Sequence, residues 1–195
     1  MIDAAAYFAA ELAEHADVLA QTRRGLGPEF TRMLDVWTAA IESGNKLVFF
    51  GNGGSAGDAQ HLATELTVRY KRDRAPIAAI ALTTDSSALT AIGNDLGFDQ
   101  LFARQIEALC RSGDVAVAIS TSGKSPNVIA GLKTAQAMDM RLTGLGGGDG
   151  GDMVGLADPL LLIPTRTTAR IQEMHITLGQ MLCGALELRL ELVTC

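Results

Sequence analysis

One arrangement occurs twice in this chain: an apolar run stops abruptly at a loop of glycine and serine residues. The first copy is KLVFFGNGGSAGD over Lys46–Asp58, and the second is DVAVAISTSGKS over Asp114–Ser125. A short apolar run that meets small residues is typical of a buried strand leading into the N-terminus of a helix. Free backbone N–H groups, the positive end of the helix dipole and Ser/Thr hydroxyls can bind an oxyanion there. The repeat therefore predicts an α/β fold that holds one phosphorylated ligand with two loops.

Strand and helix patterns alternate along the rest of the chain. Apolar spacing predicts two opening helices, Ala4–Arg23 and Glu29–Ser43, separated by the breaker Gly25–Pro28. Five short runs have the composition of strands: Leu47–Phe50, Ile77–Leu82, Val115–Ile119, Leu142–Leu145 and Leu160–Ile163. Buried strands joined by helical crossovers form a parallel sheet with helices on both faces. We therefore expect a three-layer, doubly wound, five-stranded parallel sheet whose ligands bind at the carboxyl edge.

A long apolar segment closes the chain, from Thr167 to about Val193. Its apolar residues cover most of the circumference of a helix: Ile171, Met174, Ile176, Leu178, Met181, Leu182, Leu186, Leu188, Leu190 and Leu192. A helix that is apolar all round must be buried, and in a chain of 195 residues another subunit is the expected cover. Gln172 and Gln180 interrupt this surface, and polar amides in such a helix need a buried partner.

The composition excludes several classes of protein. A formal charge of -6 argues against general nucleic-acid binding, which needs a positive surface. No apolar run reaches membrane-spanning length, and acidic residues stand where a signal peptide has a basic start. Cys110, Cys183 and Cys195 are odd in number, widely spaced and without a CxxC pair, which predicts packing roles in a reducing cytosol. We expect a cytoplasmic protein without nucleic-acid or membrane partners.

Two nucleotide-binding motifs are matched only in part. Gly123–Ser125 looks like the end of a P-loop, but the glycine that such a loop needs five positions earlier is Ala118. The glycine turn, Gly146–Gly151, fits the pattern GxGxxG after a strand, yet no acidic residue follows at the ribose-binding spacing. We reject the P-loop and interpret the glycine turn as a simple flexible turn.

Three other features each leave two interpretations open. The hydroxyl loop, Ser120–Ser125, is either an ordinary turn or an anion site at the edge of the sheet. His61 and Glu65 stand four apart in the helix expected to begin near Ser55, so they share a face that is either solvated or supplies a base to the ligand. The basic run Arg69–Arg74 is either a solvated helix end or a guide for an anionic substrate.

Four motifs together resemble the sugar isomerase (SIS) family, and most closely its sedoheptulose 7-phosphate isomerases. They are GNGGSAGDAQH at Gly51–His61, TTD-x-x-x-LTAIGND at Thr83–Asp95, STSGKSPN at Ser120–Asn127 and ARIQEMH at Ala169–His175. The resemblance covers nearly the whole chain, with the motifs in order. It implies the SIS fold, with a five-stranded parallel sheet, and a homotetramer with active sites at subunit interfaces. The implied reaction converts sedoheptulose 7-phosphate to D-glycero-D-manno-heptose 7-phosphate, the first step of ADP- or GDP-heptose synthesis for lipopolysaccharide.

The resemblance also assigns site residues. It implies that Glu65 is the general base and that position 180, here Gln180, is the second catalytic position. Substrate contacts are implied for Asn52, Gly53, Gly54, Ser55, Glu65, Arg69, Asp95, Ser120, Thr121, Ser122, Ser125 and Gln172. Some members bind zinc through His, Glu, Gln and a second His, and the matching positions here are His61, Glu65, Gln172 and Gln180. A divalent metal, zinc, is thus the implied cofactor and would act as a Lewis acid on the sugar oxygens.

Gln180 is the main departure from the family pattern. Better-known members have a histidine there that is both a metal ligand and an acid/base group, whereas a glutamine amide does not titrate near neutral pH. Glutamine can offer its carbonyl oxygen to a metal or bond to a sugar hydroxyl, but it is a poorer zinc ligand than imidazole. His175 does not replace the missing histidine, because it lies on another side of the helix.

Two classes of function stay open. Glu65, His61, Asp95 and the hydroxyl loop favour an isomerase whose base moves a proton between C1 and C2 through an enediol, on this or another phosphosugar. Gln180 favours a SIS-fold tetramer that has lost catalysis and works as a binding or regulatory module.

One SIS domain is expected over residues 1–195. Within it, residues 1–45 are the predicted oligomerisation helices, 46–166 the α/β core and 167–195 the C-terminal helix. No linker or low-complexity segment divides the chain.

Overall fold

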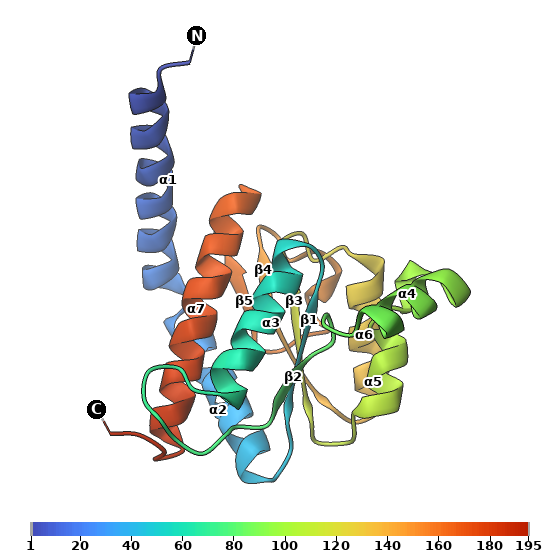
Figure 1. The fold of residues 1–195 in the computed structure, drawn as a ribbon. Helices are drawn as coiled ribbons and strands as arrows, with labels where there is room; N and C mark the ends of the chain where they lie inside the picture. Colours follow the sequence, from blue (N-terminus) through green and yellow to red (C-terminus); the bar gives the residue numbers. More distant parts are fainter. Residues whose placement is uncertain (1, 195) are drawn as a thin grey trace.

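The computed structural model of the protein describes residues 2–194, along which strands and helices alternate (Figure 1). The strands are β1 (Leu47–Gly51), β2 (Ala79–Ala81), β3 (Val115–Ser120), β4 (Arg141–Gly147) and β5 (Leu160–Ile163). The α-helices of this part of the chain are α1 (Ala4–Gly25), α2 (Gly27–Glu42), α3 (Gly54–Thr67), α4 (Ser86–Asp95), α5 (Ala103–Leu109), α6 (Pro126–Ala137) and α7 (Thr168–Arg189). Two short 3-10 helices are η1 (Phe98–Gln100) and η2 (Gly151–Met153).

The strands form one parallel sheet in the order β2-β1-β3-β4-β5. Successive side chains of a strand point to opposite faces, so both faces of β1 need a cover. Leu47 and Phe49 join a core that includes residues of α2, α3 and α7, whereas Val48 and Phe50 join one with residues of α5 and α6. Figure 1 shows these two groups of helices on opposite sides of the sheet. The predicted three-layer, doubly wound, five-stranded sheet is confirmed.

Some element boundaries differ from the predicted ones. α1 continues through Gly25, and only Leu26 separates it from α2. The predicted break is this narrow because Pro28 lies in the first turn of α2, where a missing N–H removes no helical hydrogen bond. β2 is shorter than predicted, and α7 already ends at Arg189.

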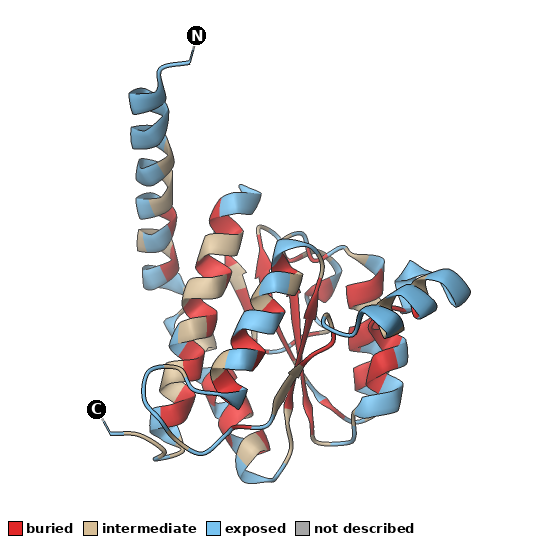
Figure 2. Ribbon diagram, in the orientation of Figure 1, coloured by how far each residue is buried: buried red, intermediate tan, exposed pale blue. Residues whose placement is uncertain are grey.

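The cover of α7 corrects a prediction. α7 contacts α1, α2, α3 and the sheet of its own chain, and its apolar residues Met174, Leu178 and Leu182 are buried without a second subunit. Its large apolar side chains that stay exposed are Met181 and Leu188. α1 instead projects from the body of the molecule and is mostly exposed (Figure 2). The exposed large apolar residues of the N-terminal segment are Ile2, Tyr7, Phe8, Leu12 and Leu19.

The lengths of the helices and the environments of the cysteines bear on two further predictions. Among the described residues no helix is both long and apolar enough to cross a membrane. Cys183 is buried and Cys110 is half-buried, and both are free thiols, in agreement with packing roles. Burial raises the pKa of the Cys110 thiol to about 11 and raises that of Cys183 further. Cys195 lies outside the described residues, so its packing role stays a prediction.

Candidate active site

Both loops identified in the sequence lie at the carboxyl edge of the sheet, where its winding reverses. β1 and β3 are parallel neighbours, and β2 lies on the other side of β1 while β4 and β5 continue beyond β3. Such a switch point leaves a crevice at the ends of the strands, where ligands of doubly wound sheets bind. Asn52 from the first loop and Asn127 from the start of α6 exchange two side-chain hydrogen bonds, of 2.8 and 2.9 Å. The two loops are therefore tied together at one edge.

The hydroxyl loop is internally braced. The Oγ of the buried Ser120 accepts a hydrogen bond from the backbone N–H of Gly123, and the Oγ of Ser122 accepts one from the N–H of Lys124. Ser125 is the N-cap residue of α6. Each of these hydroxyls keeps its own O–H for donation to a ligand. The loop thus presents donors on a fixed backbone, as an anion site requires.

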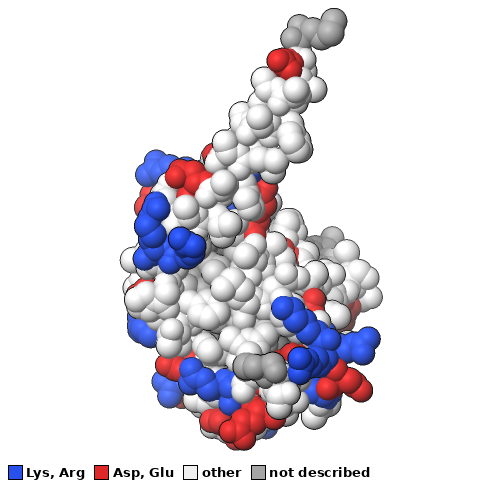
Figure 3. Space-filling model, turned by 90° about the vertical axis from the view of Figure 1, so that its left-hand side faces the viewer, with Lys and Arg blue, Asp and Glu red and all other residues white. Residues whose placement is uncertain are grey.

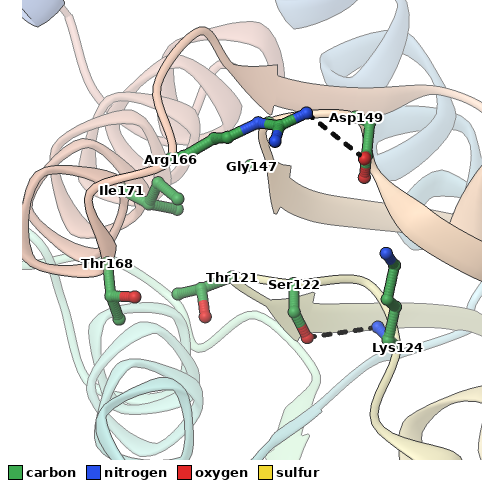
Figure 4. Close-up of a pocket in the computed structure, with 9 residues that line it drawn as sticks. Thr121, Ser122, Lys124, Gly147, Asp149, Arg166, Thr168 and Ile171 are labelled. Carbon is green, nitrogen blue, oxygen red and sulfur yellow. Dashed lines mark hydrogen bonds and ion pairs between the residues drawn. The ribbon is translucent and has the colours of Figure 1, made fainter.

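A cavity of about 230 Å³ lies beside this loop (Figure 4). Of the predicted site residues, Thr121 and Ser122 line it. Sequence reasoning missed its other polar walls, which are Lys124, Asp149, Arg166 and Thr168. The glycine turn also contributes, because Gly147 and Gly148 face the cavity. The glycine turn is a turn, as predicted, but it packs against the hydroxyl loop. The pairing of β4 with β3 brings it to this cavity, and that strand order is the signal that could have predicted its position.

The first loop leads directly into α3. Gly53 adopts a φ of 58°, and the helix begins at Gly54, next to the buried Ser55. Gln172 of α7 lies against this first turn so closely that a Cβ added at Gly54 would be 2.6 Å from its Nε2. Of the residues predicted to contact substrate, Asn52, Gly54, Ser55 and Gln172 are therefore brought together.

His61 and Glu65 form a second cluster, with Gln180. The Nε2 of His61 lies 3.0 Å from the Oε1 of Glu65 and 3.1 Å from the amide nitrogen of Gln180. The Glu65 side chain is 19% exposed and that of His61 is 46% exposed. A ring nitrogen either donates or accepts, so when the Nε2–H of His61 donates to Glu65, the amide N–H of Gln180 cannot donate to the same nitrogen. The partner of Gln180 is thus His61, and it is half-exposed, not buried as predicted.

α3 and α7 run side by side, and α7 contacts α3 at two different heights. Gln172 contacts Gly54, whereas Gln180 contacts His61, seven residues farther along α3, or roughly 10 Å at 1.5 Å per residue. Glu65 lies one further turn away. Three of the four predicted metal ligands, His61, Glu65 and Gln180, thus lie together, whereas Gln172 lies against the first turn of α3. Within residues 2–194 no group of three or more His, Cys, Asp and Glu side chains could hold a metal ion.

Arg69 and Asp95 are two further predicted substrate contacts, and both are exposed. Arg69 follows the end of α3 and is exposed. Asp95 is exposed at the end of α4, where it accepts a hydrogen bond from Asn94. Figure 1 shows α4 on the side of the sheet opposite α3, so a single chain does not bring Asp95 to Glu65.

Arg74 is an exception to both interpretations of the basic run, whose other basic residues, Arg69, Lys71 and Arg72, are exposed. Its side chain is 1% exposed, and its Nε lies 2.8 Å from the Oε1 of Glu187, which is 2% exposed. The guanidinium also donates to the carbonyl oxygens of Glu65 and Leu66, at 2.8 and 2.7 Å. Arg74 is therefore neither solvated nor free to guide a substrate. It caps the carboxyl end of α3 and fixes it to α7.

His175 is buried between α7 and the sheet. Its Nε2 lies 3.0 Å from the carbonyl oxygen of Gly146, and its Nδ1 is buried without a hydrogen-bond partner among residues 2–194. Burial lowers the pKa of His175 to about 4, so the ring is neutral at pH 7. It holds α7 against β4 and does not replace the missing acid/base group, as predicted.

Comparisons with known proteins agree with this fold. The SIS domain family matches residues 11–147. The phosphoheptose isomerase of Paramagnetospirillum magneticum is 53% identical over 91% of this chain and 92% of its own length, and that of Aquifex aeolicus is 53% identical over 76% and 78%.

Solved structures give the same result. A phosphoheptose isomerase structure from Neisseria gonorrhoeae has a TM-score of 0.87 at 42% identity, over 93% of this chain and 97% of that one. One from Francisella tularensis has a TM-score of 0.90 at 29% identity, over 96% and 100%. Sequence identity near one half and a shared fold extend over almost the whole length. The chain belongs to the SIS domain family and, within it, to the phosphoheptose isomerases.

Proposed function

We propose that this protein converts sedoheptulose 7-phosphate to D-glycero-D-manno-heptose 7-phosphate through an enediol. One observation carries the proposal: Glu65, mostly buried, lies 3.0 Å from His61 on the helix that starts at a phosphate-type loop. A binding module has no physical need for such a carboxylate on that helix. The names of the relatives agree with an isomerase of this class.

Each group has a separate task in this reaction. The hydroxyl loop, with Asn52 and Ser55, fixes the phosphate and so restricts where C1 and C2 can lie. Glu65 takes a proton from the carbon next to the carbonyl group and returns it to the other carbon. Because Gln180 does not titrate, proton exchange between the two sugar oxygens falls to water or to the substrate itself.

The proposed complete site lies between copies of the chain. Within one chain Glu65 is eleven residues beyond Gly54, or roughly 16 Å along α3. A second copy that brings its hydroxyl loop or its Asp95 to this Glu65 would shorten the distance. Figure 3 shows that most of the visible surface of the projecting α1 is uncharged, with an acidic group near its tip, and its exposed large apolar residues supply an interface. This supports a homotetramer in which residues 1–45 serve assembly, as predicted from the sequence.

A divalent metal, zinc, remains a prediction that one chain supports only in part. His61, Glu65 and Gln180 supply a nitrogen and two oxygens at close range, whereas Gln172 points to the start of α3. A fourth ligand would therefore have to come from another copy or from a rearranged Gln172. We derive no step of the reaction through the metal.

An isomerase assay with metal analysis tests the proposal. Glu65→Gln keeps the shape of the side chain but removes the base, and we expect kcat to fall about 100-fold or more. Glu107→Gln on α5 is the matched control, since Glu107 is exposed and forms only a surface pair with Arg104. Full activity of Glu65→Gln would show that the base is another group. If Gln180→His changes neither rate nor metal content, position 180 does not belong to the site.

Gln180 also supports the second candidate, a SIS-fold binding or regulatory protein. Wild-type protein that leaves sedoheptulose 7-phosphate unchanged, with and without added zinc, would favour that candidate. Activity on another phosphosugar would instead keep the chemistry and change the substrate. A cytoplasmic location and a place at the start of nucleotide-heptose synthesis for lipopolysaccharide follow from the same proposal.

A further inference from the structure

The cavity beside the hydroxyl loop contains two cationic side chains to which the proposed reaction assigns no task. Lys124 comes from the hydroxyl loop itself, and Arg166 comes from the segment before α7 (Figure 4). The hydroxyls of Thr121, Ser122 and Thr168 line the same cavity. The volume of about 230 Å³ equals that of roughly eight waters in the liquid, enough for a phosphate group and the end of a sugar.

Close packing between the hydroxyl loop and the glycine turn fixes the place of Lys124. Gly123 has a φ of 64°, and a Cβ there would be 1.9 Å from the carbonyl oxygen of Gly150. The carbonyl oxygen of Gly123 also accepts a hydrogen bond from the N–H of Asp152. A Cβ at Gly151 would be 2.8 Å from the Cγ of Lys124, so the stem of the lysine rests on the glycine turn. The start of the lysine side chain is thereby fixed beside the cavity, which Lys124 lines while it stays exposed.

Arg166 is held only loosely on the opposite wall. Its Nη2 lies 3.8 Å from the Oδ2 of Asp149, and the two side chains are 86% and 61% exposed. An exposed ion pair of this length contributes little, because water and salt screen it. Lys124 has no ion-pair partner among the described residues. Two cations thus face one cavity with a single carboxylate between them, in a chain whose net charge is -6.

We propose that Lys124 and Arg166 are further substrate-binding residues that hold the phosphate of the sugar. In the free protein Arg166 pairs with Asp149, and the phosphate replaces Asp149 as its partner when substrate binds. The proposal rests on the proposed function for the identity of the sugar phosphate. A phosphate dianion attracts the guanidinium more strongly than one carboxylate does, and it can accept two parallel N–H bonds from it. Lys124 adds a point charge on the other side, next to the hydroxyls of Thr121 and Ser122.

Kinetics of charge-removing variants test this assignment. Lys124→Met and Arg166→Gln should each raise KM about tenfold or more, with kcat within about threefold, because a charge-assisted hydrogen bond to phosphate is lost. Asp149→Asn frees Arg166 and should lower the inhibition constant of inorganic phosphate up to about fivefold. Lys133→Met on α6 is the matched control, since Lys133 is exposed and does not line the cavity.

Titration with inorganic phosphate, measured by calorimetry on the same proteins, separates this proposal from the proposed function. If the wild type binds phosphate and Lys124→Met and Arg166→Gln bind it more weakly, the anion site stands even if sedoheptulose 7-phosphate is not isomerised. If both variants keep the KM and the phosphate affinity of the wild type within twofold, the assignment is wrong. A wild type that isomerises the sugar but shows no competition by inorganic phosphate also contradicts it.

Discussion

The buried ion pair between Arg74 and Glu187 gives the sharpest prediction on stability. Glu187→Leu leaves a guanidinium that is 1% exposed without its counter-ion and leaves the N–H of Tyr70 without its acceptor. Breaking such a pair from one side costs about 3–5 kcal/mol. In a chain of 195 residues each kcal/mol lowers Tm by about 2–4 °C, so the expected fall is about 6–20 °C. Thermal unfolding followed by circular dichroism at one fixed protein concentration measures it.

A double-mutant cycle separates this effect from simple loss of packing. Arg74→Met alone should be similarly destabilised, because it leaves the Glu187 carboxylate buried and unpaired. The double variant contains no unpaired buried charge, so the sum of the single losses should exceed its loss by about 2 kcal/mol or more. Arg189→Met is the control, since its 3.0 Å pair with Asp35 is exposed and should cost less than about 1 kcal/mol. A loss below 1 kcal/mol for Glu187→Leu, or strictly additive losses, would refute the reasoning.

Three further predictions concern single positions. Gly123→Ala should lower Tm, because the new Cβ would be 1.9 Å from the oxygen of Gly150 at a φ of 64°; Gly57→Ala, with nothing within 4 Å, should raise Tm slightly. Burial raises the pKa of the Cys183 thiol, so it should react with a maleimide at pH 7 only after unfolding, and rapid labelling of Cys183 itself in the folded protein, located by peptide mapping, would contradict this. The folded-state pKa of His175, about 4, lies below its ordinary value, so the unfolded chain takes up the proton first as pH falls from 6.5 toward 4. The wild type should lose up to roughly 3 kcal/mol of stability relative to His175→Gln over that window, and parallel pH profiles in urea unfolding would show that His175 is not the cause.

Much of the fold could be read from local patterns. Val48 and Phe50 belong to an apolar run bounded by small residues, and such a run specifies a buried strand wherever it is placed. The spacing of His61 and Glu65 likewise fixes their common helix face, and the structure shows them 3.0 Å apart. The length of β2 was less predictable. It is an edge strand, so its ends depend on which of its backbone N–H and C=O groups pair with β1.

The parts of the site that depend on contacts distant in sequence could not be predicted. In the sequence Arg74 looks like one of several solvated cations, and only the packing of α7 against α3 shows that it forms a buried ion pair with Glu187. The glycine turn reads as a flexible connection until β4 and β3 become neighbours and bring Gly150 against the hydroxyl loop. The same placement turns Lys124 and Arg166, 42 positions apart in the sequence, into two walls of one cavity.

The sequence by itself determined the parallel α/β sheet, its two loops and the helix that carries the proposed base, because strand burial, small-residue turns and helical spacing are encoded over a few residues. Only the tertiary structure decided where these pieces meet. It placed Gln172 at the first turn of α3 and Gln180 at His61. The physical reason is that the packing of α3 against α7 is set by complementary surfaces more than 100 residues apart, which no local pattern records.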